Sequence, residues 1–153
     1  MRGQQDFDFL FGRWTVRHRR LRARGSGCRD WEEFDGTAET RPLLGGLCDI
    51  EEHQIPDQDF SGVALRTFEP AKELWSIYWV SARDGLLQRP VIGRFEGDIG
   101  RFEGDDADGD RPVKVHFLWQ RGGDLPRWEQ SFSYDSGETW ELNWVMVFQR
   151  PSH

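Results

Sequence analysis

The side chains best suited to acid/base chemistry in this sequence are its histidines, because an imidazole changes charge near neutral pH. The sequence has four of them, His18, His53, His116 and His153. His18 lies four residues after Trp14 in a stretch where apolar and polar residues alternate, so we expect both on the inner face of one strand. His18 is therefore the best candidate for a catalytic acid or base or a metal ligand, although an interior histidine is also commonly a hydrogen-bonded part of the core.

The other three histidines are weaker candidates. His153 is the last residue, and chain ends are seldom held firmly enough to build a site. His116 alternates with apolar neighbours and should point outward. His53 shares its face with apolar residues but also with Asp49 and Glu51, so its orientation is left open.

Polar residues also interrupt strands that should be half buried. Gln130 lies on the same face as Trp128, and a buried amide requires a hydrogen-bond partner, either a neighbouring side chain or a ligand. Arg94 lies in another such strand. Tryptophan side chains would give a ligand pocket flat walls, each with an N–H donor. The candidate ligand-binding residues are therefore His18, Trp79, Arg94, Trp128, Gln130 and Trp144.

Familiar catalytic and metal-binding motifs are missing from the sequence. It has no P-loop, no GxGxxG, and no Ser-His-Asp or Cys-His pattern. Cys28 and Cys48 are its only cysteines and lack metal-ligand spacing, so we expect two free thiols and no metal site, with a disulfide as the open alternative. The acidic run over 103–110 lacks the spacing of a calcium loop and is typical of a solvated hairpin tip.

The run RWTVRHRRLRAR over 13–24 contains six arginines, which suggests a nucleic-acid site. Strand geometry would spread these side chains over both faces, however, and the sequence carries 27 acidic against 20 basic residues, a net charge of −7. We therefore expect the arginines to pair with acidic residues such as Glu32 and Glu33, and we expect no nucleic-acid partner.

The composition indicates one globular domain over 1–153. A chain of 153 residues with eight Trp and eleven Phe is too aromatic to be disordered, and with 31% charged residues it is too polar for a membrane span. The N-terminal stretch lacks the pattern of a secretory signal, which makes the cytoplasm the default location. The expected partner is a small molecule rather than a membrane, and a homodimer is left open.

Alternating apolar residues extend from Trp14 to Phe148, and turn signals separate them at strand-length intervals. Helical spacing is found only at Phe7, Leu10 and Phe11. Because an open meander of about ten strands would leave two unpaired edges, closure is favoured over a sandwich. The predicted fold is all-β: a single antiparallel up-and-down β-barrel of about ten strands with a short N-terminal helix.

The two C-terminal strands have the clearest pattern, with a large residue at every second position. This pattern predicts an inward face, because a slip of one residue would expose the whole apolar set to water. The predicted inward residues are Trp128, Gln130, Phe132, Trp140, Leu142, Trp144 and Met146.

The segment DFDFLF followed by Gly12, Arg13 and Trp14 resembles the G-x-W start of lipocalin and broader calycin barrels. The resemblance implies that a helical turn plugs one end of the barrel. It also implies that Trp14 packs at the base with an arginine from the last strand across its indole. Arg150 is placed to be that arginine, forming a structural latch.

A resemblance over nearly the whole chain is to the uncharacterised bacterial family DUF1579. It is carried by DFDFLFGRWTVRHRRL, EEFDGTAETRPLLGGL, WSIYWV, PVIGRFEGD and RWEQSFSYDSGETWELNWVMVFQR. This resemblance implies a calycin-like barrel but no reaction or ligand. A more distant likeness to haem-binding barrels of the nitrobindin type would imply haem as a cofactor and an axial histidine, and the sequence identifies no residue for that role.

Three functional hypotheses remain. The first is a barrel that binds a small apolar or planar molecule in an aromatic cavity, with His18, Arg94 and Gln130 supplying polarity. The second is an isomerase or cyclase of the same shape that uses His18 as the base. The third is an interaction domain whose barrel is completely filled.

Overall fold

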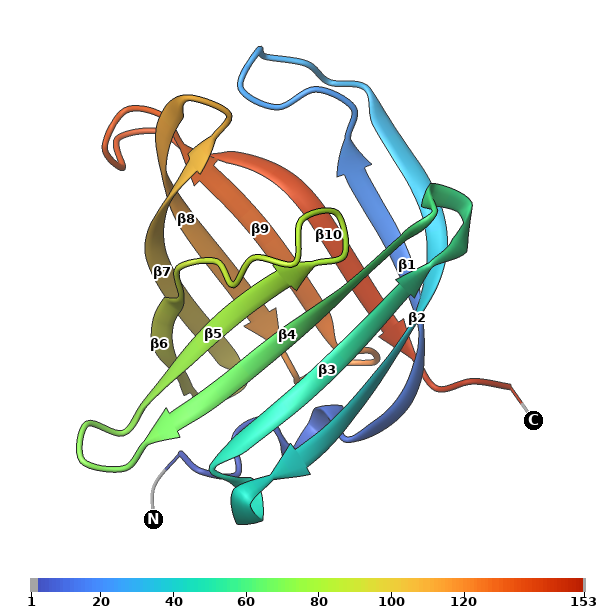
Figure 1. Ribbon diagram of the computed structural model, residues 1–153, viewed down its shortest axis with the longest axis vertical. Helices are drawn as coiled ribbons and strands as arrows, with labels where there is room; N and C mark the ends of the chain where they lie inside the picture. Colours follow the sequence, from blue (N-terminus) through green and yellow to red (C-terminus); the bar gives the residue numbers. More distant parts are fainter. Residues whose placement is uncertain (1–2, 153) are drawn as a thin grey trace.

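The computed structural model describes residues 3–152, whose ten strands form a closed antiparallel barrel (Figure 1). Each strand pairs with its neighbours along the chain, and the last strand returns to pair with the first. This confirms the predicted all-β barrel. The strands are β1 (Gly12–Leu21), β2 (Trp31–Leu43), β3 (Cys48–Ile55), β4 (Phe60–Glu69), β5 (Leu74–Ser81), β6 (Val91–Glu96), β7 (Ile99–Asp108), β8 (Arg111–Gln120), β9 (Arg127–Ser133) and β10 (Glu141–Gln149).

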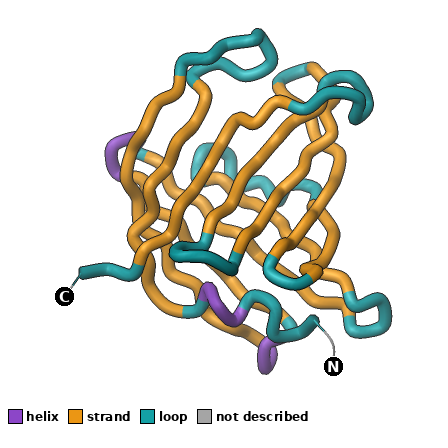
Figure 2. Tube along the Cα trace, turned by 180° about the vertical axis from the view of Figure 1, so that it is seen from behind, coloured by secondary structure: helices purple, strands orange, loops and turns teal. Residues whose placement is uncertain are grey.

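The N-terminal segment closes one end of the barrel (Figures 1 and 2). The expected helix is only a 3₁₀ turn, η1 (Asp8–Leu10), because its bonds join residues three apart, as in Leu10 N–H to the Phe7 carbonyl. Phe7 is 1% exposed, and its ring lies 5.0 Å from that of Trp75 between ring centroids. Two further short turns, η2 (Leu44–Gly46) and η3 (Pro56–Gln58), connect β2 to β3 and β3 to β4.

The predicted latch between Arg150 and Trp14 is present. The Arg150 guanidinium lies 3.6 Å from the centroid of the Trp14 ring, and it donates hydrogen bonds to the carbonyls of Phe11 and Arg13. Trp14 in turn donates its indole N–H to the Leu10 carbonyl over 2.8 Å. The latch therefore joins the last residues of the barrel to the N-terminal plug.

The C-terminal strands follow the predicted alternation except at the start of β10. A β-bulge shifts the register between Leu142 and Trp144, and it turns Asn143 inward, where it is fully buried. Leu142 pairs with Ser131 on β9. Ser131 lies between two inward residues of β9 and therefore faces outward. Its partner Leu142 also faces outward, so the prediction that Leu142 faces inward is wrong. The prediction for Trp140 is also wrong, because this residue precedes β10 and is 42% exposed.

Two further features of residues 3–152 bear on the expected class of protein. No helix in this range is long and apolar enough to cross a membrane. Within the same range Cys28 and Cys48 are free thiols, as expected.

Replacing the latch residue should lower stability without changing the fold. We expect Arg150→Ala to reduce the free energy of unfolding by about 1 to 2 kcal/mol, because it removes a cation–π contact and two hydrogen bonds to backbone carbonyls. Arg41→Ala is the matched control, since its ion pair with Glu52 is exposed and should contribute little. Urea unfolding of both variants measures the difference, and equal midpoints would argue against the latch.

Candidate functional site: an aromatic cavity beside a buried charge chain

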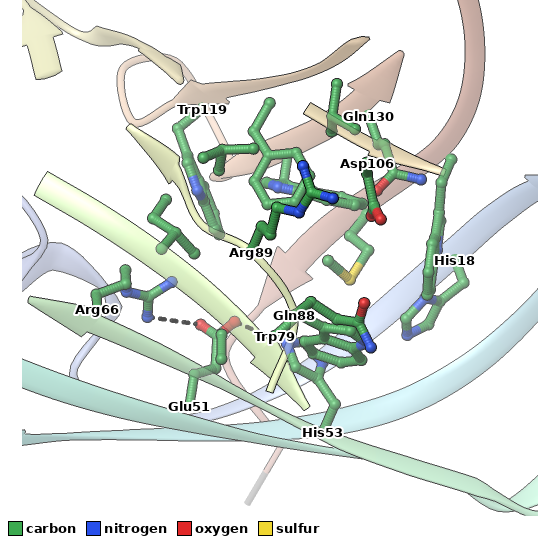
Figure 3. Close-up of a pocket in the computed structure, with 18 of the residues that line it drawn as sticks. His18, Glu51, His53, Arg66, Trp79, Gln88, Arg89, Asp106, Trp119 and Gln130 are labelled. Atoms are coloured by element: carbon green, nitrogen blue, oxygen red, sulfur yellow. Dashed lines mark hydrogen bonds and ion pairs between the residues drawn. The ribbon is translucent and has the colours of Figure 1, made fainter. Parts of the chain in front are cut away.

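The barrel contains a cavity, whose lining residues include Trp79 and Trp119 (Figure 3). Its open space is about 110 Å³, comparable to cavities that hold a molecule of the size of benzene. The interior is therefore not completely filled. The walls are mainly aromatic and aliphatic, and the side chains that carry the argument below are His18, Glu51, His53, Arg66, Trp79, Trp119, Trp128, Gln130 and Trp144.

Inward-facing glycines make room for the rings in this cavity. A Cβ atom at Gly62 would lie 2.3 Å from the Trp79 indole, and one at Gly36 would lie 3.1 Å from Nε2 of His18. Contacts this short would force the rings to move. Glycine at these two positions on β4 and β2 therefore lets Trp79 and His18 lie against the barrel wall.

A chain of buried charged groups runs along β3 and β4 beside the cavity. Arg66 donates from Nε to Asp49 over 2.6 Å and from its terminal nitrogen to Oε2 of Glu51 over 3.1 Å. Glu51 also accepts a hydrogen bond from Thr40 over 3.0 Å, and its Oε1 lies 2.7 Å from Nε2 of His53. All five residues are at most 2% exposed, so the groups must satisfy one another.

Aromatic rings surround the guanidinium of Arg66. The Arg66 guanidinium carbon lies 4.6 Å from the centroid of the Phe7 ring and 5.8 Å from that of Trp119. Arg66 therefore connects the charge chain to the N-terminal plug through its contact with Phe7.

The pKa values of these buried charged groups follow from their burial and their pairing. Burial raises the pKa of Glu51, but Arg66 and His53 outweigh it and hold the pKa well below its usual range. Burial lowers the pKa of Arg66, but Asp49 and Glu51 outweigh it and raise the pKa overall. For Asp49 burial prevails over Arg66, so its pKa is raised. Glu51 is therefore an ionised carboxylate at neutral pH, and it can only accept hydrogen bonds.

Because the Glu51 carboxylate only accepts, His53 donates to it from Nε2. His18 has the opposite arrangement. Its Nδ1 accepts the Trp144 indole N–H over 3.0 Å, so its Nε2 carries the proton. Among residues 3–152 neither His53 Nδ1 nor His18 Nε2 has a hydrogen-bond partner. Both atoms are buried, and His18 Nε2 lies against Gly36 at the barrel wall.

The two imidazoles lie close together at the cavity, with ring centroids 6.3 Å apart. Burial, then the neighbouring His53 and Arg20, lower the pKa of His18 to about 3. His18 is therefore neutral at physiological pH.

Five of the six candidate ligand-binding residues line the cavity: His18, Trp79, Trp128, Gln130 and Trp144. Arg94 does not, and its predicted place in the cavity is wrong, because Val91 and Phe95 take the inward positions of β6 and leave Arg94 exposed on the outer face. The amide of Gln130 donates to Oδ1 of Asn143 over 2.8 Å, so its partner is a neighbouring side chain.

Sequence reasoning missed Glu51 and Arg66 as parts of the site and left the orientation of His53 open. The available signal was their spacing, since Asp49, Glu51 and His53 alternate on one face of a strand. An inward arginine on the next strand, Arg66, is the partner that lets this acidic face be buried.

The arginine-rich strand pairs with acidic residues as expected, except that Arg19 packs over the Trp31 ring. Arg17 pairs with Glu33 and Asp35, and Arg20 pairs with Glu32 over 3.1 Å. These contacts are consistent with arginines that pair with acidic neighbours on the next strand.

The site does not fit a metal or a haem. Within residues 3–152 no cluster of three or more His, Cys, Asp or Glu side chains could hold a metal ion. A tetrapyrrole is several times larger than a cavity suited to a benzene-sized molecule. In addition, His18 Nε2 lies over Gly36 at the barrel wall, which leaves no room there for a macrocycle.

Comparisons with known proteins assign no family. The sequence matches no protein-family model, and no curated protein matches it significantly. The function must therefore be argued from the geometry of the cavity.

Loss of the Arg66 charge should destabilise the barrel strongly. We expect Arg66→Ala to lower the free energy of unfolding by about 3 to 5 kcal/mol, because it leaves Asp49 and Glu51 buried without their cation. Arg17→Ala, which removes only exposed ion pairs, should change stability little. Similar urea midpoints for the two variants would contradict the role given to the charge chain.

The low pKa of His18 should make stability depend on pH. Below about 6.5 the unfolded chain binds a proton at His18 that the folded protein binds only near pH 3, so stability falls as the pH is lowered. Between pH 7 and pH 5 we expect the wild type to lose about 2 kcal/mol more than His18→Gln, whose amide can still accept from Trp144 but does not titrate. Parallel losses in urea unfolding at the two pH values would rule out a buried neutral His18.

Proposed function

We propose that this barrel binds one small, neutral, largely planar molecule in the cavity between His18, His53 and the tryptophan walls. The observation that carries the proposal is the open space of about 110 Å³ lined by Trp79, Trp128 and Trp144. A filled interaction domain is less well supported, because the interior contains open space.

The chemistry of the walls indicates the class of ligand. Trp79 lies 5.9 Å from His53 between ring centroids, and Trp128 and Trp144 are 5.6 Å apart, so flat apolar surfaces surround the polar pair. Charged residues of both signs line the cavity, Glu51, Asp105 and Asp106 against Arg66 and Arg89, and most of its lining surface is apolar. The ligand class supported best is therefore a neutral, largely apolar ring or short chain.

The resemblance of the sequence to DUF1579 and to calycin barrels agrees with a ligand-binding barrel but names no ligand. We retain it as a proposal about family. The enzyme hypothesis with His18 as the base is less well supported, because Nδ1 of His18 accepts the Trp144 indole N–H and its Nε2 is buried against Gly36.

Phenol is a suitable probe because it has a planar ring and one hydroxyl that both donates and accepts. We expect isothermal titration calorimetry to show phenol binding, and we expect Trp144→Ala to weaken it at least tenfold. This change removes a wall and the indole that orients His18. Trp140→Ala is the matched control, since Trp140 is outside the cavity and should leave affinity within twofold.

Equal affinity in the wild type, Trp144→Ala and Trp140→Ala would place any binding outside the barrel interior. Native mass spectrometry and a visible absorption spectrum of freshly purified protein would show whether a molecule is retained, and a Soret band would contradict the exclusion of haem.

A further inference from the structure

We infer that the cavity opens through the side of the barrel, between β5 and β7, and that the segment over 82–90 is a flap that opens to admit the ligand. The inference rests on the proposed binding function, because it gives the bound molecule its route into the same cavity. It is carried by the strand register, by the residues that line the cavity and by the way the flap is attached.

The barrel wall is irregular where β6 begins. β5 pairs with β6 only from Trp75 to Ile77, whereas it continues beside β4 as far as Ser81. On the other side, β7 pairs with β6 only up to Glu103 but continues beside β8 to Asp108. The last residues of β5 and of β7 therefore have no regular strand between them.

The flap fills this gap and is bonded to one side of it (Figure 1). The backbone N–H of Gln88 donates to the Trp79 carbonyl over 2.9 Å, and Leu87 forms an isolated bridge with Val80. Among residues 3–152 no hydrogen bond between backbone groups joins 82–89 to β7. The flap is therefore attached to β5 and can separate from β7 without breaking a strand ladder.

The flap packs little apolar surface onto the barrel. No residue over 82–90 is buried, and its two leucines, Leu86 and Leu87, are 62% and 59% exposed. Segments with few buried apolar contacts open at a low cost in free energy while the rest of the protein stays folded. The flap can therefore open while the strands remain paired.

The cavity reaches the solvent at this gap. Most of the residues that line it are buried or half-buried, and the exposed ones are Arg89 on the flap and Asp105 on β7. Gln88 and Asp106 line the cavity beside them (Figure 3). The two sides of the gap are thus also the two sides of the cavity mouth.

Gly104 marks one end of the gap. A Cβ atom there would lie 2.6 Å from the Pro90 carbonyl oxygen and 3.2 Å from Cα of Val91, so the chain rests directly on β7 at this point. Neighbouring strands are about 4.8 Å apart, so β5 and β7 are separated by about 10 Å where the flap lies between them. When the flap swings outward, this width admits a flat ring.

The test measures how fast a buried thiol in the cavity becomes accessible. It uses a protein with Cys28→Ser and Cys48→Ser, into which either Ala64→Cys or Ala38→Cys is introduced. Both alanines are buried, at 6% and 4% exposure, but of the two only Ala64 lines the cavity. The reagent is benzyl methanethiosulfonate, which carries a ring of the proposed ligand class, and mass spectrometry follows the labelling.

We expect Ala64→Cys to be labelled faster than Ala38→Cys by about 100-fold or more, because the flap exposes the first thiol and only unfolding exposes the second. Low concentrations of urea should leave the first rate nearly unchanged and raise the second steeply, since local opening exposes much less surface than unfolding. Equal rates with the same dependence on urea would overturn the inference.

Loosening the flap should speed entry. Gln88→Pro removes the N–H that bonds Trp79, so labelling of Ala64→Cys should become about fivefold faster or more while that of Ala38→Cys does not change. Asp124→Pro, in the β8–β9 loop that lines no part of the cavity, is the matched control and should change neither rate. Labelling of Ala64→Cys that Gln88→Pro does not speed, or that Asp124→Pro speeds as much, would place the entrance elsewhere.

Phenol separates this inference from the binding function. Saturating phenol should slow the labelling of Ala64→Cys, because it fills the space that the reagent must enter. Phenol that binds in calorimetry, with labelling of Ala64→Cys no faster than that of Ala38→Cys, would overturn the flap and leave the binding function intact. Fast labelling that Gln88→Pro speeds further, without phenol binding, would retain the flap as the route into the cavity and overturn the binding function.

Discussion

The carboxylate of Glu51 is the interaction on which most of the interior depends. It is fully buried, and it joins three strands by bonding Thr40 on β2, Arg66 on β4 and His53 on its own strand. A buried charge is costly unless every lone pair is satisfied, so this side chain requires its neighbours to stay where they are. The same constraint decides which nitrogen of His53 carries the proton.

The charge chain also separates the two ends of the barrel. Arg66 stacks on Phe7, and Phe7 packs with Trp75 and Trp119, so the closed end is filled by aromatic side chains around one guanidinium. Above this layer the inward positions of β2 and β4 are small, as at Gly36 and Gly62. The rings of Trp79 and His18 occupy the space that these two glycines leave.

Much of the fold could be predicted because apolar and polar residues alternate along the strands. Alternation predicts the strands, and closure follows from the cost of unpaired edges. The rule fails where the backbone departs from regular pleating. The bulge at Asn143 inserts one extra inward residue, which no period-two pattern can reveal, and it displaces Leu142 from the inner face.

The candidate site was harder to predict, because its central residues are charged. Asp49, Glu51 and His53 lie on one face of an alternating strand. Because this face carries two carboxylates, it suggests exposure to solvent unless the cation that pairs with them is known. Arg66 supplies that cation from the next strand, and the pairing emerges only from the register. Arg94 shows the opposite case, since an arginine among apolar residues took the outer face and needed no partner inside.

The two imidazoles are held by neighbours of opposite kind. His53 donates from Nε2 to the Glu51 carboxylate, whereas Nδ1 of His18 accepts from the Trp144 indole. Neither neighbour can reverse its role, because a carboxylate has no proton to donate and an indole N–H has no lone pair to offer. The charge chain and Trp144 therefore fix the orientation of both rings in the barrel wall. Because these polar groups bond one another, the surface that is left to the cavity is mainly apolar.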